Sequence, residues 1–184
     1  MGKYQFGKVL RKSALSENGS RQMCNTMLFE EAVWHFITNH QMDEMIGNIH
    51  DLRRQTDMVH KGFDFESEEL CIEIKIFLSK TNADYGSLMK RFWHSIEQMI
   101  GCFSGSSGIG TDGKRRILLM VGQRGFNKGV RRLIRKKKDR VLKKAADMGL
   151  ELWVAEVEME AEAGMELLSY ENMTNEMGGG MGNG

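Results

Sequence analysis

The sequence predicts an α/β fold in which a mixed central sheet is flanked by helices. Residues 70–78 give the clearest strand pattern, because β-branched residues are frequent and aliphatic side chains occupy every second position. Residues 85–101 repeat apolar side chains at i, i+3 and i+4, which is typical of a helix with one buried face. Helical and strand patterns alternate along the chain, and this alternation favours helices layered on a sheet.

The first half of the chain is predicted to supply one helix and three strands. Asn25 or Thr26 can cap a helix over residues 27–39. Glu30 and Glu31 fall in its first turns, where the helix dipole favours acidic side chains. Three strands should follow, the first of them polar and at an edge of the sheet: residues 52–60, 63–65 and 70–78.

The second half of the chain should alternate between helices and strands. The amphipathic helix at 85–101 precedes a short apolar run at 116–121, which indicates a buried strand. A basic helix over 127–148 should stop at Gly149, a residue typical of helix ends. Residues 150–159 are predicted as the last strand, so the element order is α-β-β-β-α-β-α-β.

Length and composition limit the class of protein. The chain has 184 residues, of which 41% are hydrophobic, and this share excludes general disorder. No apolar stretch reaches the roughly 18 residues that a membrane helix needs, and the first residues lack the apolar run of a signal peptide. The three cysteines form no metal-ligand spacing, so we expect a reduced, cytoplasmic protein that does not bind membranes.

Three segments follow from these patterns. We expect an N-terminal extension over residues 1–24 and an α/β domain over residues 25–160. Residues 161–184 are acidic and end in a run of glycines, which is typical of a flexible tail.

The net charge of +1 conceals two opposed regions. Residues 124–144 contain eleven Lys or Arg and one acid, whereas residues 151–184 contain eight Glu and no Lys or Arg. A concentrated basic segment indicates a polyanion-binding surface, and the plainer interpretation is a solvated helix face neutralised by nearby acids. The side chains predicted to contact nucleic acid are Arg124, Lys128, Arg131, Arg132, Arg135, Lys136 and Lys138.

Two charged residues stand at the centre of the strand predicted for residues 70–78. Because side chains alternate, Glu73 and Lys75 lie on the face opposite the aliphatic residues. Burying these charges costs free energy unless they are paired or bind something. Asp64, between two phenylalanines, precedes the strand at a spacing that a hairpin would bring beside it. The plainer interpretation is an ion pair between Glu73 and Lys75 on a half-exposed sheet.

An Asp followed by Glu-x-Lys on the next strand resembles the arrangement in PD-(D/E)xK nucleases. The resemblance implies a restriction-endonuclease-like αβββαβ core. It also implies that Asp64 and Glu73, with a backbone carbonyl, hold Mg²⁺ or Mn²⁺. The metal would activate a water and offset charge on the scissile phosphate. Lys75 would orient that water and stabilise the transition state.

A closer resemblance concerns the sugar fermentation stimulation protein family of DNA/RNA nucleases. Residues 63–65 and 72–75, Phe-Asp-Phe and Ile-Glu-Ile-Lys, are similar to the family's FDF…IEVK stretch. Residues 25–32 resemble its NxLVEEAL helix, which would place Glu31 (or Glu30) near the metal as a further catalytic carboxylate. The chain would be a shortened member, because it lacks the family's N-terminal OB-like domain and its proline-containing loop.

The sequence therefore predicts a metal-dependent endonuclease that acts on DNA or RNA. One alternative is a non-catalytic nucleic-acid-binding or assembly protein that uses the helix over 127–148, with Glu73 and Lys75 merely paired. Another is an interaction module whose basic helix meets an acidic protein. Because branched-DNA resolvases resemble this pattern and are commonly dimers, we also expect that a homodimer is possible.

Overall fold

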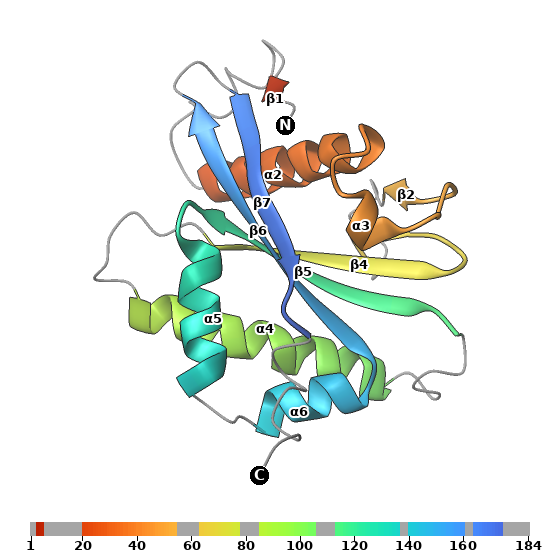
Figure 1. Ribbon diagram of the computed structural model, residues 1–184, viewed down its shortest axis with the longest axis vertical. Helices are drawn as coiled ribbons and strands as arrows, with labels where there is room; N and C mark the ends of the chain where they lie inside the picture. Colours follow the sequence, from red (N-terminus) through yellow and green to blue (C-terminus); the bar gives the residue numbers. More distant parts are fainter. Residues whose placement is uncertain are drawn as a thin grey trace.

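The computed structural model places helices on both faces of one mixed β-sheet (Figure 1). The described residues are 3–5, 20–54, 63–77, 85–105, 113–136, 140–160 and 164–174. The mixed α/β class predicted from the sequence is confirmed.

The chain alternates between helices and strands as follows. The helices are α2 (Ser20–Thr38), α3 (Asp43–Ile46), α4 (Tyr85–Gly105), α5 (Phe126–Lys136) and α6 (Arg140–Asp147). The strands are β1 (Lys3–Gln5), β2 (Arg53–Arg54), β3 (Phe65–Glu66), β4 (Leu70–Phe77), β5 (Arg115–Gln123), β6 (Leu150–Glu160) and β7 (Gly164–Asn172).

The sheet has parallel strands at its centre and antiparallel strands toward both edges. Its order is β1-β7-β6-β5-β4-β3-β2. Strands β4, β5 and β6 are parallel neighbours, so the chain crosses over through α4 and then through α5 and α6. Such crossovers bring helices onto the faces of a sheet. The strands outside this centre pair antiparallel with their neighbours.

Apolar side chains fill the space on both faces of the sheet. On one face, Ile117 of β5 belongs to the same buried cluster as Phe36 of α2. On the other face, Leu118 of β5 is buried together with Phe92 of α4. Strand β5 is therefore covered on both sides, which explains why its sequence is a nearly unbroken apolar run.

A close contact sets the turn from β5 into α5. A Cβ on Gly122 would stand 2.2 Å from the side chain of Phe126, so only glycine fits beside this ring. The Phe126 ring in turn stacks on Phe77 of β4, with 5.4 Å between the ring centroids. Gly125 completes the turn with a φ of +89°, in a region that L-residues rarely adopt. This packing fixes the start of α5 against the sheet.

Strand β7 corrects the expectation of a flexible tail that starts at residue 161. It pairs antiparallel with β6, which is therefore an interior strand and not the last one. Met165 and Leu167 are buried in the core. The acidic composition of this segment hid their alternation with polar residues, and burial of these side chains is what holds the strand. Residues 175–184 of the predicted tail lie outside the described residues.

The basic helix expected over residues 127–148 is divided into α5 and α6, which run in different directions (Figure 1). Val130 and Ile134 of α5 are buried in the same cluster as Leu142 and Ala145 of α6. Residues 135–140, which lie between these two pairs, are all charged. Such a stretch cannot face an apolar core, so two shorter helices satisfy the packing where a single straight one would not.

The N-terminal boundary also differs from the expectation. Helix α2 begins at Ser20, so Asn25 and Thr26 lie inside it and do not cap it. The predicted extension over residues 1–24 therefore contributes β1 and the start of α2. Strand β2 lies at the edge of the sheet, as expected for the described part of residues 52–60.

Candidate functional site

The carboxylate of Asp64 takes the place of a strand partner at the edge of β4. Pairing between β3 and β4 ends where Phe65 faces Ile72. Two residues further along β4, the N–H of Ile74 donates a hydrogen bond of 2.6 Å to Oδ2 of Asp64. The side chain thereby continues the hydrogen bonding that the short strand β3 leaves off, and it holds Asp64 against the strand that carries Glu73 and Lys75.

Glu73 and Lys75 form an ion pair on β4. The distance between Lys75 Nζ and Glu73 Oε1 is 2.5 Å. Both side chains are half-buried, with 30% of Lys75 and 19% of Glu73 exposed. This contact is the one that the plainer interpretation of the sequence expected. It also leaves the second oxygen of Glu73 out of the pair.

Burial and repulsion between carboxylates raise the affinity of Asp64 and Glu30 for protons. Burial raises the pKa of Asp64 to about 7, and the negative charges of Glu73 and Glu30 act in the same direction. The hydrogen bond from Ile74 and the charge of Lys75 oppose the shift. Burial also raises the pKa of Glu30, with Arg54 opposing the shift and Glu73 adding to it. Asp64, Glu73, Glu30 and Lys75 thus interact electrostatically as one group, which we call the acidic cluster.

The predicted catalytic residue Glu31 has a different neighbour. Its Oε2 forms an ion pair with Nη1 of Arg54 on β2. Glu30, the residue before it on α2, is the one whose charge acts on Asp64. Adjacent helical residues differ by about 100° around the axis, so either glutamate can face β4, depending on how α2 is rotated. The sequence motif does not specify that rotation and could not separate the two.

The carboxylates of the acidic cluster suit a hard divalent cation. Asp64 and Glu73 offer oxygen ligands, which Mg²⁺ and Mn²⁺ prefer. A cation between them would relieve their mutual repulsion, which adds to the effect of burial on the pKa of Asp64. Within the described ranges, no three His, Cys, Asp or Glu side chains gather closely enough to hold an ion by themselves. A metal here would therefore depend on two carboxylates together with backbone oxygen and water.

Arg91 is a basic residue near the acidic cluster that the sequence analysis did not single out. Its Nη2 donates a hydrogen bond of 2.9 Å to the carbonyl of Ile76, the residue after Lys75. The guanidinium lies over the Phe77 ring, 5.4 Å from the centroid. The apolar repeat of α4 predicts its buried face, and it carries no information on which exposed residue, such as Arg91, contacts β4.

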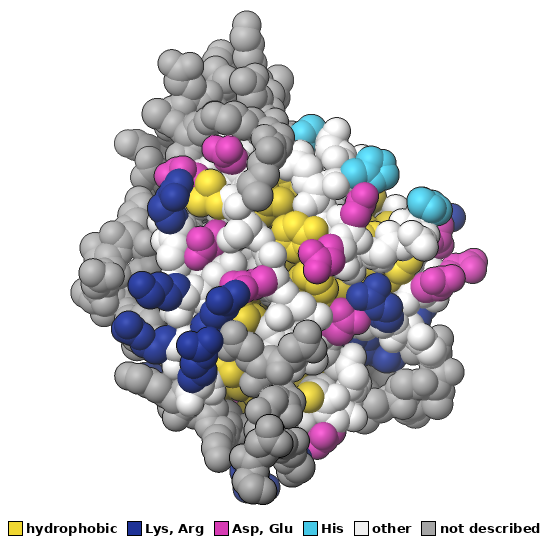
Figure 2. All heavy atoms as spheres, in the orientation of Figure 1, with side chains coloured by type: hydrophobic (Ala, Val, Ile, Leu, Met, Phe, Trp, Pro, Cys, Tyr) yellow, Lys and Arg dark blue, Asp and Glu magenta, His cyan; other side chains and the backbone are white. Residues whose placement is uncertain are grey.

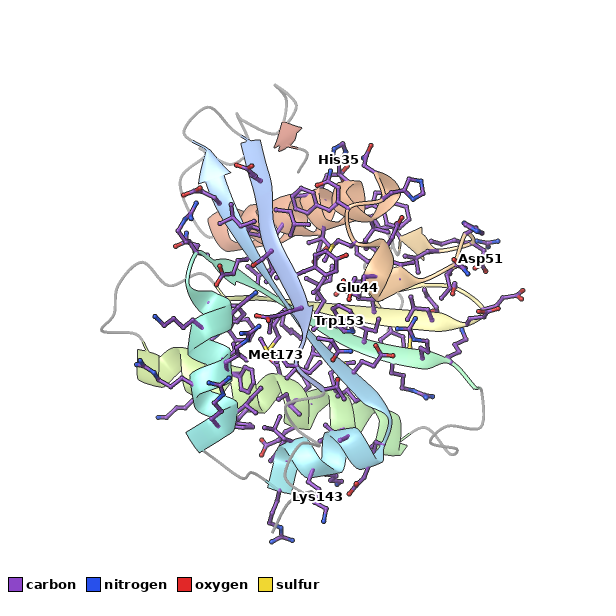
Figure 3. All side chains as sticks on the ribbon, in the orientation of Figure 1. His35, Glu44, Asp51, Lys143, Trp153 and Met173 are labelled. Atoms are coloured by element: carbon purple, nitrogen blue, oxygen red, sulfur yellow. The ribbon has the colours of Figure 1, made fainter. Side chains whose placement is uncertain are left out.

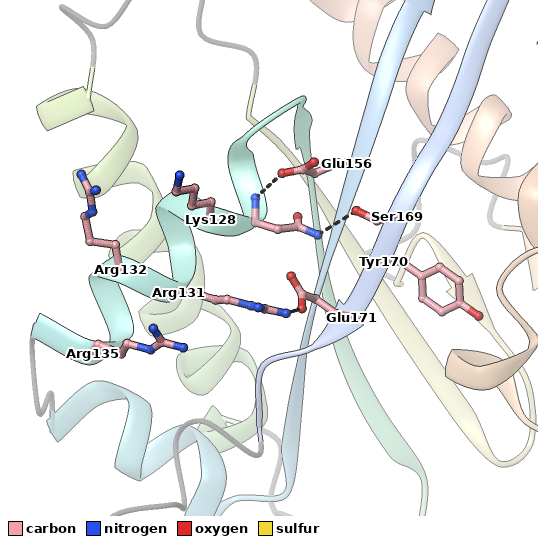
Figure 4. A pocket seen from close by; sticks show the side chains of 9 residues that line it. Lys128, Arg131, Arg132, Arg135, Glu156, Ser169, Tyr170 and Glu171 are labelled. Carbon is pink, nitrogen blue, oxygen red and sulfur yellow. Dashed lines mark hydrogen bonds and ion pairs between the residues drawn. The ribbon is translucent and has the colours of Figure 1, made fainter.

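A second polar region lies between α5 and the strands β6 and β7 (Figure 4). This groove has a volume of about 750 Å³. Four of the predicted nucleic-acid contacts line it, and Figure 2 shows Lys and Arg side chains gathered on this part of the surface. The lining residues are Asn127, Lys128, Arg131, Arg132, Arg135, Glu156, Ser169, Tyr170 and Glu171.

Acidic side chains of β6 and β7 contact the basic residues of this region. Arg131 forms an ion pair with Glu171 of β7. Arg124, in the turn before α5, pairs with Glu158 of β6 at 2.8 Å, and this hydrogen bond raises the pKa of Arg124. The C-terminal glutamates thus partly neutralise the basic segment within the folded chain.

Two predicted contacts remain, Lys136 and Lys138. Lys136 is the last residue of α5, and Lys138 lies outside the described residues.

Comparison with known proteins identifies no relative of this chain. No protein-family model, no curated protein and no solved structure matches this chain. The likeness to the PD-(D/E)xK nucleases and to the sugar fermentation stimulation proteins therefore stays a prediction from short motifs. Across the described part of the chain, no helix has the length and apolar character needed to span a bilayer.

Proposed function

We propose that this protein is a metal-dependent nuclease that hydrolyses phosphodiester bonds in DNA or RNA. The observation that carries the proposal is the acidic cluster, in which Asp64 reaches β4 beside Glu73 and Lys75. The order α2-α3-β2-β3-β4-α4-β5 is compatible, with the one-turn helix α3 as an addition, with the restriction-endonuclease-like αβββαβ core that the resemblance implies. The basic groove between α5, β6 and β7 offers a separate surface for phosphates.

The chain's own residues divide the work of hydrolysis in this proposal. Asp64 and Glu73 hold Mg²⁺ or Mn²⁺ through carboxylate oxygens. When bound there, the metal would supply an acidified water and would offset charge at the scissile phosphate. Lys75, whose ammonium lies 2.5 Å from Glu73 Oε1, orients the attacking water and stabilises negative charge in the transition state. Glu30 adds negative charge that strengthens cation binding at Asp64 and Glu73.

A cleavage assay tests this function directly. Supercoiled plasmid and single-stranded RNA are incubated with the protein in Mg²⁺, in Mn²⁺ and in EDTA. We expect cleavage only with metal, and a loss of about 10²- to 10³-fold in Lys75→Ala. Lys143→Ala, an exposed lysine on α6, is the matched control and should retain activity. Cleavage that persists in EDTA, or in Lys75→Ala, contradicts the proposed role of the acidic cluster.

The second candidate is a non-catalytic nucleic-acid-binding or assembly protein. The ion pair between Glu73 and Lys75 favours it, because pairing alone accounts for both charges on β4. Salt-sensitive binding of plasmid or RNA without cleavage under any metal condition would support this candidate over the nuclease.

A further inference from the structure

The groove between α5, β6 and β7 contains a buried polar atom without a partner. Asn127 is only 6% exposed. Its Nδ2 donates a hydrogen bond of 3.2 Å to Oγ of Ser169, and its backbone N–H donates one of 2.8 Å to Oε1 of Glu156. Among the described residues, its Oδ1 has no hydrogen-bond partner. A buried acceptor in this state costs free energy of folding, and a ligand with a donor group would recover it.

Basic side chains form one wall of the same groove. Lys128, Arg131, Arg132 and Arg135 are spaced at i, i+3, i+4 and i+7, so they follow one side of α5. The stripe extends over about 10 Å of helix. Its cations can therefore contact several anionic groups at once. A phosphodiester strand carries anionic groups at such close spacing.

Carboxylates of the chain occupy the positions where a ligand's anionic groups would bind. Figure 4 shows Arg131 reaching from α5 to Glu171 on β7, and this ion pair spans the groove. Glu156 accepts the N–H of Asn127 in the first turn of α5, a position that favours negative charge. Tyr170 points away from α5 (Figure 4), so its ring is not placed to stack on a base in the groove. Recognition there must depend on charge and hydrogen bonds.

We propose that this groove binds a nucleotide unit whose phosphate replaces Glu171 on Arg131 and whose hydroxyl or amino group donates to Asn127 Oδ1. The volume of about 750 Å³ is within the usual range of small-molecule sites. Exchange of Glu171 for phosphate opens the groove, because the ion pair that spans it is broken. The same chemistry is offered by a free nucleotide and by a single nucleic-acid strand. The inference rests on the proposed function only where it takes a nucleic-acid strand as the source of the nucleotide unit.

Binding is measured in EDTA by fluorescence anisotropy, with a short fluorescein-labelled single-stranded RNA as the probe. Arg131→Ala should weaken binding about tenfold, the value of a lost charge-assisted hydrogen bond. Lys143→Ala removes the same charge from α6, where Lys143 points away from the groove (Figure 3), and should bind the probe like the unaltered protein. Equal losses in Arg131→Ala and Lys143→Ala would overturn the proposal.

Glu171, the carboxylate that pairs with Arg131, is tested with its own matched pair of variants. Glu171→Gln should tighten binding several-fold because phosphate no longer competes with a carboxylate, whereas Glu97→Gln, an exposed position on α4, removes the same charge and should not. Asn127→Ala should weaken binding without changing its salt dependence, since no charge is removed. If Glu171→Gln and Glu97→Gln tighten binding equally, or if Asn127→Ala binds normally, the groove is not the site.

Competitors separate the sources of the ligand. Displacement of the RNA by adenosine monophosphate indicates a site for a free nucleotide, and displacement only by unlabelled single strands indicates a strand site. Equal displacement by a glutamate peptide would overturn the proposal in favour of an acidic protein partner. The cleavage assay tests the proposed function independently. Binding in the groove without metal-dependent cleavage would contradict the proposed nuclease activity and not the proposed binding site. If Arg131→Ala cleaves nucleic acid and binds the probe like the unaltered protein, only the proposed binding site in the groove is contradicted.

Discussion

Lys75 and Glu171 stand in one row across the sheet. Lys75 on β4 is in register with Met120 on β5, Met120 with Val154 on β6, and Val154 with Glu171 on β7. Residues in register share a face of the sheet, and three strand spacings place the two ends of the row about 14 Å apart. Lys75 and Glu73 of the acidic cluster therefore lie on the same face as the basic groove, on the other side of the buried Met120 and Val154.

This separation makes the two regions independent in experiments. Substitutions more than about 10 Å apart that share no partner usually have additive effects. Changes at Asp64 or Glu30 should leave binding in the groove intact, and changes at Arg131 or Glu171 should leave the titration of Asp64 intact.

The stability of the protein should fall as pH rises from about 4 to about 7. The pKa of Asp64 is about 7 in the folded chain and 3.8 as a model value, so the folded state binds the extra proton in this window. Asp64→Asn should remove this slope and be more stable than the unaltered protein above pH 7, by at most about 4 kcal/mol. Denaturant unfolding at a series of pH values measures it.

Below about pH 4, Asp64 is protonated in both the folded and the unfolded state. The difference in free energy of unfolding between Asp64→Asn and the unaltered protein should therefore no longer change with pH. Asp147→Asn, at an exposed position in α6, is the control and should follow the pH dependence of the unaltered chain. A slope that survives in Asp64→Asn would mean that another group titrates in this range.

Glu30 and Glu31 should differ in their effect on Asp64. Glu30→Gln removes a negative charge that raises the pKa of Asp64, so the Asp64 midpoint should move to lower pH. Glu31→Gln should leave the midpoint in place, because Glu31 is paired with Arg54. Carbon-13 NMR of the side-chain carboxyls during a pH titration measures both. The same midpoint in both variants would contradict the assignment of Glu30 to the acidic cluster.

Mn²⁺ or Mg²⁺ should raise the thermal stability of the protein at pH 8. A ligand that binds only the folded state at a hundred times its Kd adds about 2.7 kcal/mol to the free energy of unfolding. The gain should disappear in Asp64→Asn and be reversed by EDTA, while Asp147→Asn should keep it. Differential scanning calorimetry measures the shift in Tm, and an equal shift in Asp64→Asn would place the cation elsewhere.

Gly122→Ala and Gly129→Ala should change stability in opposite directions. A Cβ on Gly122 would stand 2.2 Å from the side chain of Phe126, and such overpacking costs about 1–3 kcal/mol. A Cβ on Gly129, inside α5, meets nothing within 4 Å, and alanine there should gain about 0.5–1 kcal/mol from helix propensity. Urea unfolding of both variants tests this, and a neutral Gly122→Ala would show that Phe126 can move freely.

Strand β4 and its neighbours are the part of the fold that the sequence predicted best. The alternation from Leu70 to Ile76 places the aliphatic side chains on the face that α2 covers, as the buried cluster confirms. The pattern worked because a strand repeats every two residues whatever packs against it. Strand β7 escaped prediction because it stands in a stretch with several glutamates that ends in a run of glycines, which was interpreted as a tail, and only pairing with β6 buries Met165 and Leu167.

The two polar regions differ in the same way. Asp64, Glu73 and Lys75 were grouped from spacing alone, since a hairpin returns the chain beside itself over a short distance. The choice of Glu30 over Glu31, and the contact of Arg91 with Ile76, depend on how helices α2 and α4 are rotated against the sheet. Periodicity in one segment carries no such information, because rotation is set by packing between segments.

By itself, the sequence determined the α/β class, the strand with Glu73 and Lys75, and the concentration of basic residues around α5. These depend on local periodicity and on the count of charges, which a chain carries in any conformation. Only the tertiary structure decided that Glu171 meets Arg131, that Asn127 Oδ1 is left without a partner, and that Glu171 shares a row with Lys75. Those relationships join residues far apart in the chain, and they arise from the order in which the strands enter the sheet.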